Sequence, residues 1–260
     1  MIERHPVIFL GAGPGDPELI TVKGQKALAQ AEVIFYAGSL VSPALLGWAR
    51  PGAELIDTAP LNLEEIVTGI IRAQRAGKRV VRVHSGDTAL FSAMQEQLEI
   101  LEREGIPCRV IPGVTAAGAA AAALAQELTL PELTQTVILT RAPGRTPVPE
   151  GEALRDLARH GATLVIYLSA KLIESVVAEL TPAYSPETPV VVAYRVSWPE
   201  EQIIRGTLAD IAARVRQAGI ERQALILVGP ALAPREGGLK ARSKLYDKAF
   251  AHGCRSGKGD

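Results

Sequence analysis

Short apolar segments alternate with longer segments of helical periodicity through the first half of the chain. Between Leu63 and Ala76 the apolar side chains recur every three or four positions, which predicts one buried helix face, and Gly77 ends that helix. Because strands and helices alternate at this spacing, we expect parallel strands joined by right-handed crossovers. The predicted strands are Val7–Leu10, Val33–Tyr36, Glu54–Asp57, Arg79–His84 and Cys108–Ile111, and the predicted helices are Thr21–Gln30, Leu63–Ala76 and Phe91–Glu104.

The second half repeats this alternation without a recognisable sequence repeat. Its predicted strands are Thr136–Thr140, Ala162–Leu168, Pro189–Tyr194, Gln202–Ile204 and Ala224–Val228, and its predicted helices are Ala116–Ala125, Glu152–Arg159 and a helix ending at Ala218. We expect a capping box at Thr207–Asp210 to open that last helix. The turn Trp198-Pro199-Glu200 predicts that the strands on either side of it pair. The pattern therefore predicts an α/β fold of two α/β domains, residues 1–113 and 114–237, and a C-terminal tail, 238–260.

Composition narrows the possible partners and the compartment. The chain has 28 Lys and Arg and 28 Asp and Glu, and this zero net charge argues against a nucleic-acid or anionic-membrane partner. No apolar segment approaches the ~20 residues of a membrane span, and no signal peptide is recognisable. Cys108 and Cys254 lie far apart, which favours a reduced, cytoplasmic protein. The four histidines lack ligand spacing, so no metal site is predicted.

A glycine-rich loop, Gly11-Ala-Gly-Pro-Gly-Asp16, follows the first predicted strand. Such turns present backbone N–H groups to the pyrophosphate of dinucleotides, but here the sixth position is an aspartate and Ala37-Gly38 replaces the ribose-binding acid. A nicotinamide-dependent oxidoreductase is therefore disfavoured, and a tight turn without a ligand remains an alternative. Pro14 and Pro17 fix φ, which predicts a rigid loop at the carboxyl end of a strand.

Two more polar turns follow predicted strands, at Val83-His-Ser-Gly-Asp-Thr88 and Pro112-Gly-Val-Thr-Ala116. Asp87, Thr88 or Thr115 would serve equally well as helix N-caps, so neither turn alone indicates a ligand. Three such turns on successive strands of one domain nevertheless predict a binding crevice, because ligands of α/β proteins bind at the carboxyl ends of strands.

These three motifs in this order resemble the tetrapyrrole (class III) S-adenosylmethionine-dependent methyltransferases, and the resemblance extends over residues 6 to 255. Further motifs are similar to the branch that methylates C11 of precorrin-4 in cobalamin biosynthesis, including its cobalt-precorrin-4 enzymes. They are Tyr36-Ala-Gly-Ser-Leu-Val-Ser42, Glu127-Leu-Thr-Leu-Pro-Glu132, Gln135-Thr-Val-Ile-Leu-Thr-Arg141, Gly144-Arg-Thr-Pro-Val-Pro-Glu150, His160-Gly-Ala-Thr-Leu-Val-Ile-Tyr-Leu-Ser169, Tyr194-Arg-Val-Ser-Trp-Pro-Glu200 and Ser243-Lys-Leu-Tyr-Asp247.

The resemblance implies two α/β domains with the cofactor S-adenosylmethionine in a cleft between them, in a homodimer. The matching cofactor-binding positions are Pro14, Ser85, Gly86, Asp87, Leu90, Thr115, Ala116, Leu168, Val196 and Ala224. Most are small or apolar, as close approach of a ligand to backbone requires, whereas Asp87 could accept from ribose hydroxyl or ammonium groups. Thr88 stands where the family usually has proline, and Phe91 where relatives often have tyrosine. Ala37-Gly38 replaces an acidic residue of uroporphyrinogen-stage relatives, which argues against that reaction.

The implied substrate is a tetrapyrrole with many carboxylates, which need cationic partners. Arg141, Arg145, Arg195 and Lys244 lie in branch-specific motifs, and arginine binds carboxylates bidentately; for Arg145 and Lys244 a solvated surface charge is the alternative. His84 is a candidate proton acceptor, against a structural histidine. Besides methylation at C11, methylation at another ring position, nicotinamide-dependent oxidation and tetrapyrrole carriage without catalysis remain open.

Overall fold

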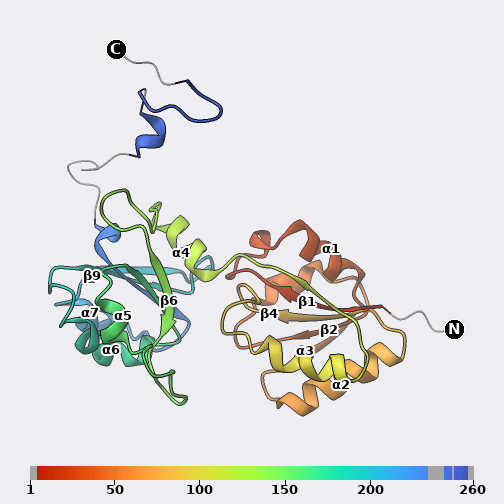
Figure 1. Ribbon diagram of the computed structural model, residues 1–260. Coiled ribbons are helices and arrows are strands. Elements are labelled where there is room, and N and C mark those ends of the chain that lie inside the picture. The colour runs from red at the N-terminus through yellow and green to blue at the C-terminus, as the bar shows by residue number, and fades with distance from the viewer. Residues whose placement is uncertain (1–4, 234–242, 248, 257–260) are drawn as a thin grey trace. The chain divides into compact units, whose positions relative to one another are not determined.

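The computed structural model describes residues 5–233, 243–247 and 249–256, which divide into two compact units (Figure 1). The first unit extends to Leu124 and also includes Tyr194–Gln202. The second comprises Ala125–Ala193 and the described residues from Ile203 onward. This division differs from the predicted boundary at residue 113, because helix α4 (Ala116–Ala123) and the turn at 194–202 belong to the first unit.

The first unit contains a five-stranded sheet in the order β3-β2-β4-β1-β5. Its strands are β1 (Val7–Gly11), β2 (Val33–Tyr36), β3 (Glu54–Asp57), β4 (Val80–His84) and β5 (Cys108–Ile111). Every neighbouring pair is parallel, which confirms the parallel pairing that the alternating pattern predicts. In the register, Gly11 pairs with His84 and Leu10 with Ile111, so β1, β4 and β5 end at the same edge of the sheet.

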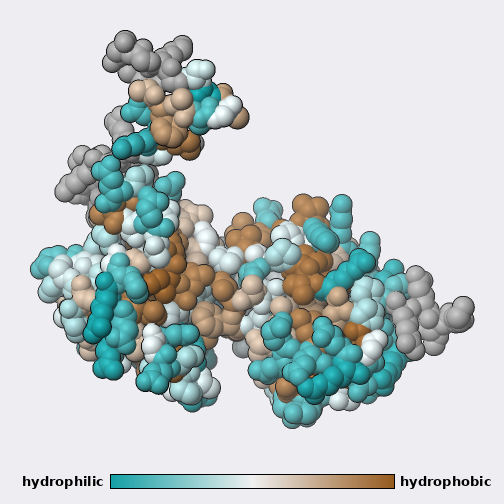
Figure 2. Space-filling view, viewed as in Figure 1, coloured by the Kyte–Doolittle hydropathy of each residue, from teal (hydrophilic) through white to brown (hydrophobic). Residues whose placement is uncertain are grey.

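Helices cover both faces of this sheet (Figure 1). Helices α2 (Leu63–Arg75) and α3 (Met94–Arg103) pack against a core that contains Phe9 and Phe35. Helix α1 (Val22–Gln30) packs on the opposite face, against Leu10 and Ile34. Hydrophilic side chains dominate the outer surface of α2 and α3 in Figure 2, as the predicted amphipathic pattern requires.

Two predicted helix starts are wrong. Helix α3 begins at Met94 rather than Phe91, because Phe91 and Ala93 have φ values of 52° and 50°, which a right-handed helix does not allow. Helix α7 (Ile211–Gln217) begins after Asp210. Of the two hydrogen bonds in the predicted capping box, the structure shows the one in which Asp210 Oδ1 accepts from the Thr207 N–H, at 2.8 Å. The N-cap is Asp210 rather than Thr207.

The second unit contains a five-stranded sheet in the order β6-β7-β10-β8-β9. Its strands are β6 (Val137–Arg141), β7 (Thr163–Tyr167), β8 (Pro189–Tyr194), β9 (Gln202–Thr207) and β10 (Ala224–Val228). Strand β7 pairs parallel with β6 and antiparallel with β10, so this sheet is mixed. The neighbouring positions of β8 and β9 confirm that these two strands pair.

Helices α5 (Leu154–Ala158), α6 (Ile173–Leu180) and α7 lie together on one face of this sheet (Figure 1). The sequence pattern did not predict α6. Among the described residues, no helix combines the length and apolar character that crossing a membrane requires. Short 3-10 helices occur at Pro17–Leu19, Pro43–Trp48, Ala170–Leu172, Pro230–Leu232 and Lys244–Tyr246.

Candidate functional site: three turns at one sheet edge

The turns that follow β1 and β4 are joined by backbone hydrogen bonds. Gly13 N–H donates to Gly86 O at 3.1 Å, and Gly86 N–H donates to Gly13 O at 2.8 Å. Ala12 N–H donates to His84 O at 2.8 Å, which extends the strand pairing into the loop. The glycine-rich loop and the Gly86 turn therefore form one continuous backbone surface.

Three glycines make this arrangement possible. A Cβ on Gly113 would lie 2.2 Å from Gly86 O, and a Cβ on Gly11 would lie 2.5 Å from Gly113 N. Gly86 itself has φ +62°, in the left-handed region that favours glycine. The turns after β1, β4 and β5 thus approach more closely than any residue with a side chain allows, and the sequence prediction that they meet is consistent with this geometry.

Asp87 joins the turns after β4 and β5. Its Oδ2 accepts from Gly113 N–H at 2.7 Å, and its Oδ1 accepts from Ala89 N–H at 2.8 Å. We expected this carboxylate to face a cofactor's hydroxyl or ammonium groups. In the structure each of its oxygens binds a backbone N–H, so its first role is to hold the two turns together.

Thr115 caps helix α4, as the alternative interpretation of this residue anticipated. Its Oγ1 accepts from Gly118 N–H at 3.1 Å, and Ala116 is the first residue of the helix. Thr88 is buried but caps no helix, because α3 begins only at Met94. Ser85 and Leu90 are half-buried in the β4 turn.

The turn between β8 and β9 supplies a fourth segment to the first unit. Ser197 Oγ accepts from Asp16 N–H at 3.0 Å, and Trp198 Nε1–H donates to Pro14 O at 2.9 Å. Val196, a predicted cofactor residue, is buried in this turn. Sequence reasoning named Pro14 and Val196 as cofactor positions but did not single out Ser197 and Trp198, whose side chains make these hydrogen bonds.

Arg195 lies in the same turn and has a φ of 44°. Its guanidinium lies over the rings of Trp198 and Tyr194, with centroids 5.2 and 5.6 Å away. Glu200 Oε2 is 3.5 Å from Nη1. The side chain is 29% exposed, so the cation is oriented by its neighbours and still reaches solvent.

The second unit has its own cluster of predicted residues at one sheet edge. Arg141 ends β6 opposite Tyr167, and Leu168 directly follows β7. Continuing the antiparallel register of β7 and β10 by two residues places Ala224 beside Leu168. Leu168 has a φ of 55° and is 69% exposed, so an apolar side chain faces outward at this edge.

Arg141 binds its own loop. Its Nη1 donates to the carbonyls of Ala142 at 3.3 Å and Thr146 at 3.1 Å, and its Nη2 donates to Pro147 O at 2.5 Å. Its guanidinium therefore organises the 142–147 loop before any ligand arrives. Arg145, in that loop, is exposed.

The model of the tetrapyrrole (corrin/porphyrin) methylases matches residues 6–212. The chain belongs to the tetrapyrrole methylase family. The cobalt-precorrin-4 C(11)-methyltransferase of Priestia megaterium is 54% identical, over 96% of this chain and 97% of the relative. The precorrin-4 C(11)-methyltransferase of Pseudomonas aeruginosa is 51% identical, over 97% and 99%.

Solved structures agree with this family assignment. The crystal structure of a cobalt precorrin-4 methyltransferase has a TM-score of 0.86 and 53% identity, over 88% of this chain and 96% of the other. A uroporphyrin-III C-methyltransferase from Thermus thermophilus, complexed with S-adenosylhomocysteine, has a TM-score of 0.70 and 28% identity, over 90% and 98%. The predicted fold of two α/β domains is thereby confirmed.

In this tetrapyrrole methylase the surroundings of His84 do not suit the role of proton acceptor that the sequence suggested. It is 4% exposed, stacks on Phe9 at 5.8 Å, and its Nε2 has no hydrogen-bond partner among the described residues. Burial, and secondarily the charge of Arg82, lower the pKa of His84 to about 3. Such a weak, enclosed base is better described as a structural histidine, the alternative that the sequence left open.

Arg82, two residues before His84, is a buried cation that the sequence analysis did not single out. It is 5% exposed, and burial lowers its pKa to about 10. Its Nε donates to Gln97 Oε1 and its Nη1 to Thr58 Oγ1, each at 3.1 Å. These neutral acceptors tie β4 to α3 and to the end of β3.

We expect acid to destabilise the methylase through His84. The unfolded chain takes up a proton below about pH 6.5, whereas the folded protein keeps His84 neutral to about pH 3. Stability is therefore lost as the pH falls through this window, by up to about 1.4 kcal/mol per pH unit. Urea unfolding between about pH 7 and 5 measures this slope.

The variant His84→Gln should reduce that slope markedly, because it removes the titrating group. His160→Gln is the matched control, since His160 is exposed and should leave the slope unchanged. An equal slope in His84→Gln and in the unmodified protein would contradict this account of His84.

The C-terminal segment holds the last predicted site residue. Lys244 is exposed. Nη2 of Arg255 donates to the carbonyls of Leu245 at 2.8 Å and Phe250 at 3.1 Å, which closes the segment on itself.

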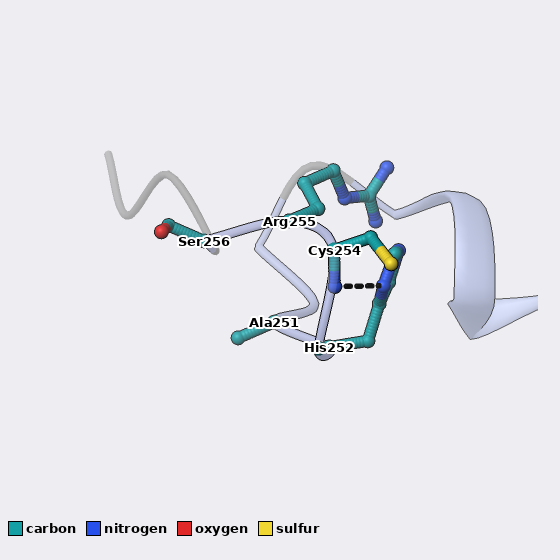
Figure 3. Close-up of a pocket in the computed structure, with 6 residues that line it drawn as sticks. Ala251, His252, Cys254, Arg255 and Ser256 are labelled. Atoms are coloured by element: carbon teal, nitrogen blue, oxygen red, sulfur yellow. Dashed lines mark hydrogen bonds between the residues drawn. The ribbon is translucent and has the colours of Figure 1, made fainter.

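Figure 3 shows the shallow pocket at 251–256, where His252 Nδ1 accepts from Cys254 N–H at 3.3 Å. None of the predicted cofactor residues lines this pocket, and the described part of the chain has no cluster of metal-ligating side chains.

Proposed function

We propose that this tetrapyrrole methylase transfers the methyl group of S-adenosylmethionine to C11 of precorrin-4 or of cobalt-precorrin-4. The observation that carries this proposal is the near full-length similarity to enzymes named for that reaction. The similarity to a uroporphyrin-III methyltransferase is far lower over a comparable length. Both a cobalt-precorrin-4 and a precorrin-4 enzyme are close relatives, so the proposal includes both substrates.

The residues of the first unit fit a cofactor of this kind. S-adenosylmethionine supplies a methyl group on a positively charged sulfur. Gly11 and Gly113 leave no room for a Cβ, and Gly86 has φ +62°. These turns therefore expose backbone at a sheet edge, where an extended polar ligand can approach closely. We propose that Pro14, Ser85, Gly86, Asp87, Leu90, Thr115, Ala116 and Val196 of the first unit, with Leu168 and Ala224 of the second, contact it.

The chain's own part in the reaction is mainly to orient the reactants and exclude water. Transfer moves positive charge from sulfur to the macrocycle, so it needs no protein nucleophile. Holding two reactants in line contributes up to about 7–11 kcal/mol in ideal cases. The rigid loop of Pro14 and Pro17 and the backbone pairing of Gly13 with Gly86 suit this role.

The carboxylates of a tetrapyrrole require cations, and Arg195 is the best placed of the four candidates. Its guanidinium is oriented by two aromatic rings and remains partly exposed. Arg141 is engaged with its own loop, and Arg145 and Lys244 are exposed. We propose Arg195 as the principal carboxylate partner, with Arg141, Arg145 and Lys244 in supporting roles.

Arg195→Ala should raise the KM for precorrin-4 by about ten- to hundredfold, since a hydrogen bond to a charged group contributes about 1.5–3 kcal/mol. The affinity for adenosylhomocysteine, measured by calorimetry without tetrapyrrole, should stay within about threefold, because backbone dominates the proposed cofactor contacts. Arg159→Ala is the control, since Arg159 is exposed and pairs only weakly with Asp156. Equal losses of both ligands in Arg195→Ala would show that Arg195 is structural.

We further propose that the protein works in the cytoplasm as a homodimer, without nucleic-acid or membrane partners. The balanced charge supports the absence of nucleic-acid and membrane partners, and the two free cysteines support the cytoplasm. The homodimer rests on the resemblance to the family alone. Sedimentation of the purified protein tests the dimer directly. A monomer at micromolar concentration would contradict it.

The proposed reaction is tested by incubating the protein with precorrin-4 and S-adenosylmethionine and weighing the product by mass spectrometry. We expect a gain of one methyl group, with release of adenosylhomocysteine. Binding of precorrin-4 without methylation would favour a carrier instead. Binding of NADH with no response to adenosylhomocysteine would favour an oxidoreductase and overturn the proposal.

A further inference from the structure

The chain contains two tryptophans. One binds the glycine-rich loop, and the other binds Pro17, the residue directly after it. Trp198 Nε1–H donates to Pro14 O at 2.9 Å, and Trp48 Nε1–H donates to Pro17 O at 3.2 Å. The loop and the residue directly after it are therefore each held by an indole donor. Neither contact is predicted by the glycine and proline pattern of the loop itself.

Trp198 does more than donate a hydrogen bond, because its ring lies against Gly15. A Cβ on Gly15 would lie 2.1 Å from Cδ1 of the indole and 2.4 Å from its Nε1. Gly15 has an ordinary φ, so backbone strain does not explain glycine there. The close approach of the indole does.

The same indole orients Arg195. The guanidinium lies 5.2 Å from the ring centroid, and the backbone N–H of Trp198, not the indole, donates to Arg195 O at 2.9 Å. Ser197, between them, accepts from Asp16 N–H at 3.0 Å. One side chain thus touches both the loop proposed to bind the cofactor and the cation proposed to bind the substrate.

We propose that Trp198 is a positioning residue that couples cofactor binding to tetrapyrrole binding. This inference rests on the proposed function of the loop and of Arg195. A cofactor bound against the loop restrains the indole that lies on Gly15, and the indole restrains the guanidinium, so each ligand favours the other. Because such coupling is reciprocal, it can be measured from either ligand.

The coupling is measured by calorimetry with adenosylhomocysteine, in the absence and in the presence of saturating precorrin-4. With the unmodified protein we expect precorrin-4 to tighten adenosylhomocysteine binding by about five- to tenfold. Trp198→Phe keeps a ring but loses the N–H to Pro14, and should reduce the factor to about one. Trp48→Phe is the matched control: it loses an N–H to Pro17, directly after the loop, but does not touch Arg195, so the factor should persist.

The inference would be overturned, with the proposed function intact, if precorrin-4 tightened adenosylhomocysteine binding by Trp198→Phe as much as it does for the unmodified protein. It would also be overturned if Trp48→Phe lost this tightening to the same extent as Trp198→Phe. A protein that binds adenosylhomocysteine but not precorrin-4 would instead contradict the proposed function.

A second measurement needs no tetrapyrrole. Gly15→Ala should weaken adenosylhomocysteine binding by at least about tenfold, and Gly15→Ala with Trp198→Ala should recover the affinity of Trp198→Ala alone. Failure of this rescue would show that the indole does not set the loop.

Discussion

Gly113→Ala is expected to abolish cofactor binding and to lower the free energy of unfolding by about 3 kcal/mol. The added Cβ would lie 2.2 Å from Gly86 O and 2.8 Å from the Gly11 carbonyl carbon. These atoms are backbone, so no side-chain rotation relieves the overlap, and the turns after β1, β4 and β5 must separate. Calorimetry with adenosylhomocysteine and urea unfolding measure the two effects.

Gly47→Ala is the matched control for Gly113→Ala. A Cβ there has open space, and the residue lies in a short surface helix of the same unit. We expect unchanged ligand affinity and a change in stability within about 0.5 kcal/mol. Normal adenosylhomocysteine binding by Gly113→Ala would show that the junction of the three turns is not the cofactor site.

Asp87→Asn should weaken adenosylhomocysteine binding by about ten- to hundredfold and lower the free energy of unfolding by about 1.5–3 kcal/mol. The two oxygens of Asp87 each accept a backbone N–H, from Gly113 and from Ala89. An amide offers one acceptor oxygen, so its NH2 group would face one of these donors. The turns after β4 and β5 would then lose a link.

Asp57→Asn provides an unusually close control. Asp57 also ends a strand of this sheet and also accepts two backbone N–H groups, from Gly38 at 2.9 Å and Ala59 at 2.8 Å. Both bonds go to the single atom Oδ1, which an asparagine retains. We expect a loss of less than about 1 kcal/mol; similar losses in the two variants would contradict the role given to Asp87.

The first sheet could be predicted closely because its signals are local. The strands Val33–Tyr36, Glu54–Asp57 and Cys108–Ile111 have the bounds that the apolar runs predict. Where a residue other than glycine has a positive φ, no local sequence signal indicates it. Neither Phe91 nor Ala93 is a residue type that favours a left-handed conformation, so the delayed start of α3 could not be foreseen.

The candidate site was predictable in outline but not in its contacts. Motifs after β1, β4 and β5 indicated that three turns meet, whereas the roles of the individual side chains depend on tertiary approach. Asp87 is held by the N–H of Gly113, and Trp198 reaches Pro14 from a turn far along the chain. The spacing of residues in the sequence carries no information on such pairs. The one hint of the Trp198 contact was Gly15, because its φ is one that any residue could adopt and so does not explain why glycine stands there.

The most direct test of the central claim is to follow the methyl group itself. Precorrin-4, and in parallel cobalt-precorrin-4, is incubated with the protein and S-adenosylmethionine carrying a carbon-13 methyl group, and the product is examined by carbon NMR. The account predicts a single labelled methyl group on C11. A label on another ring carbon, or an unlabelled tetrapyrrole with the cofactor bound, would contradict it.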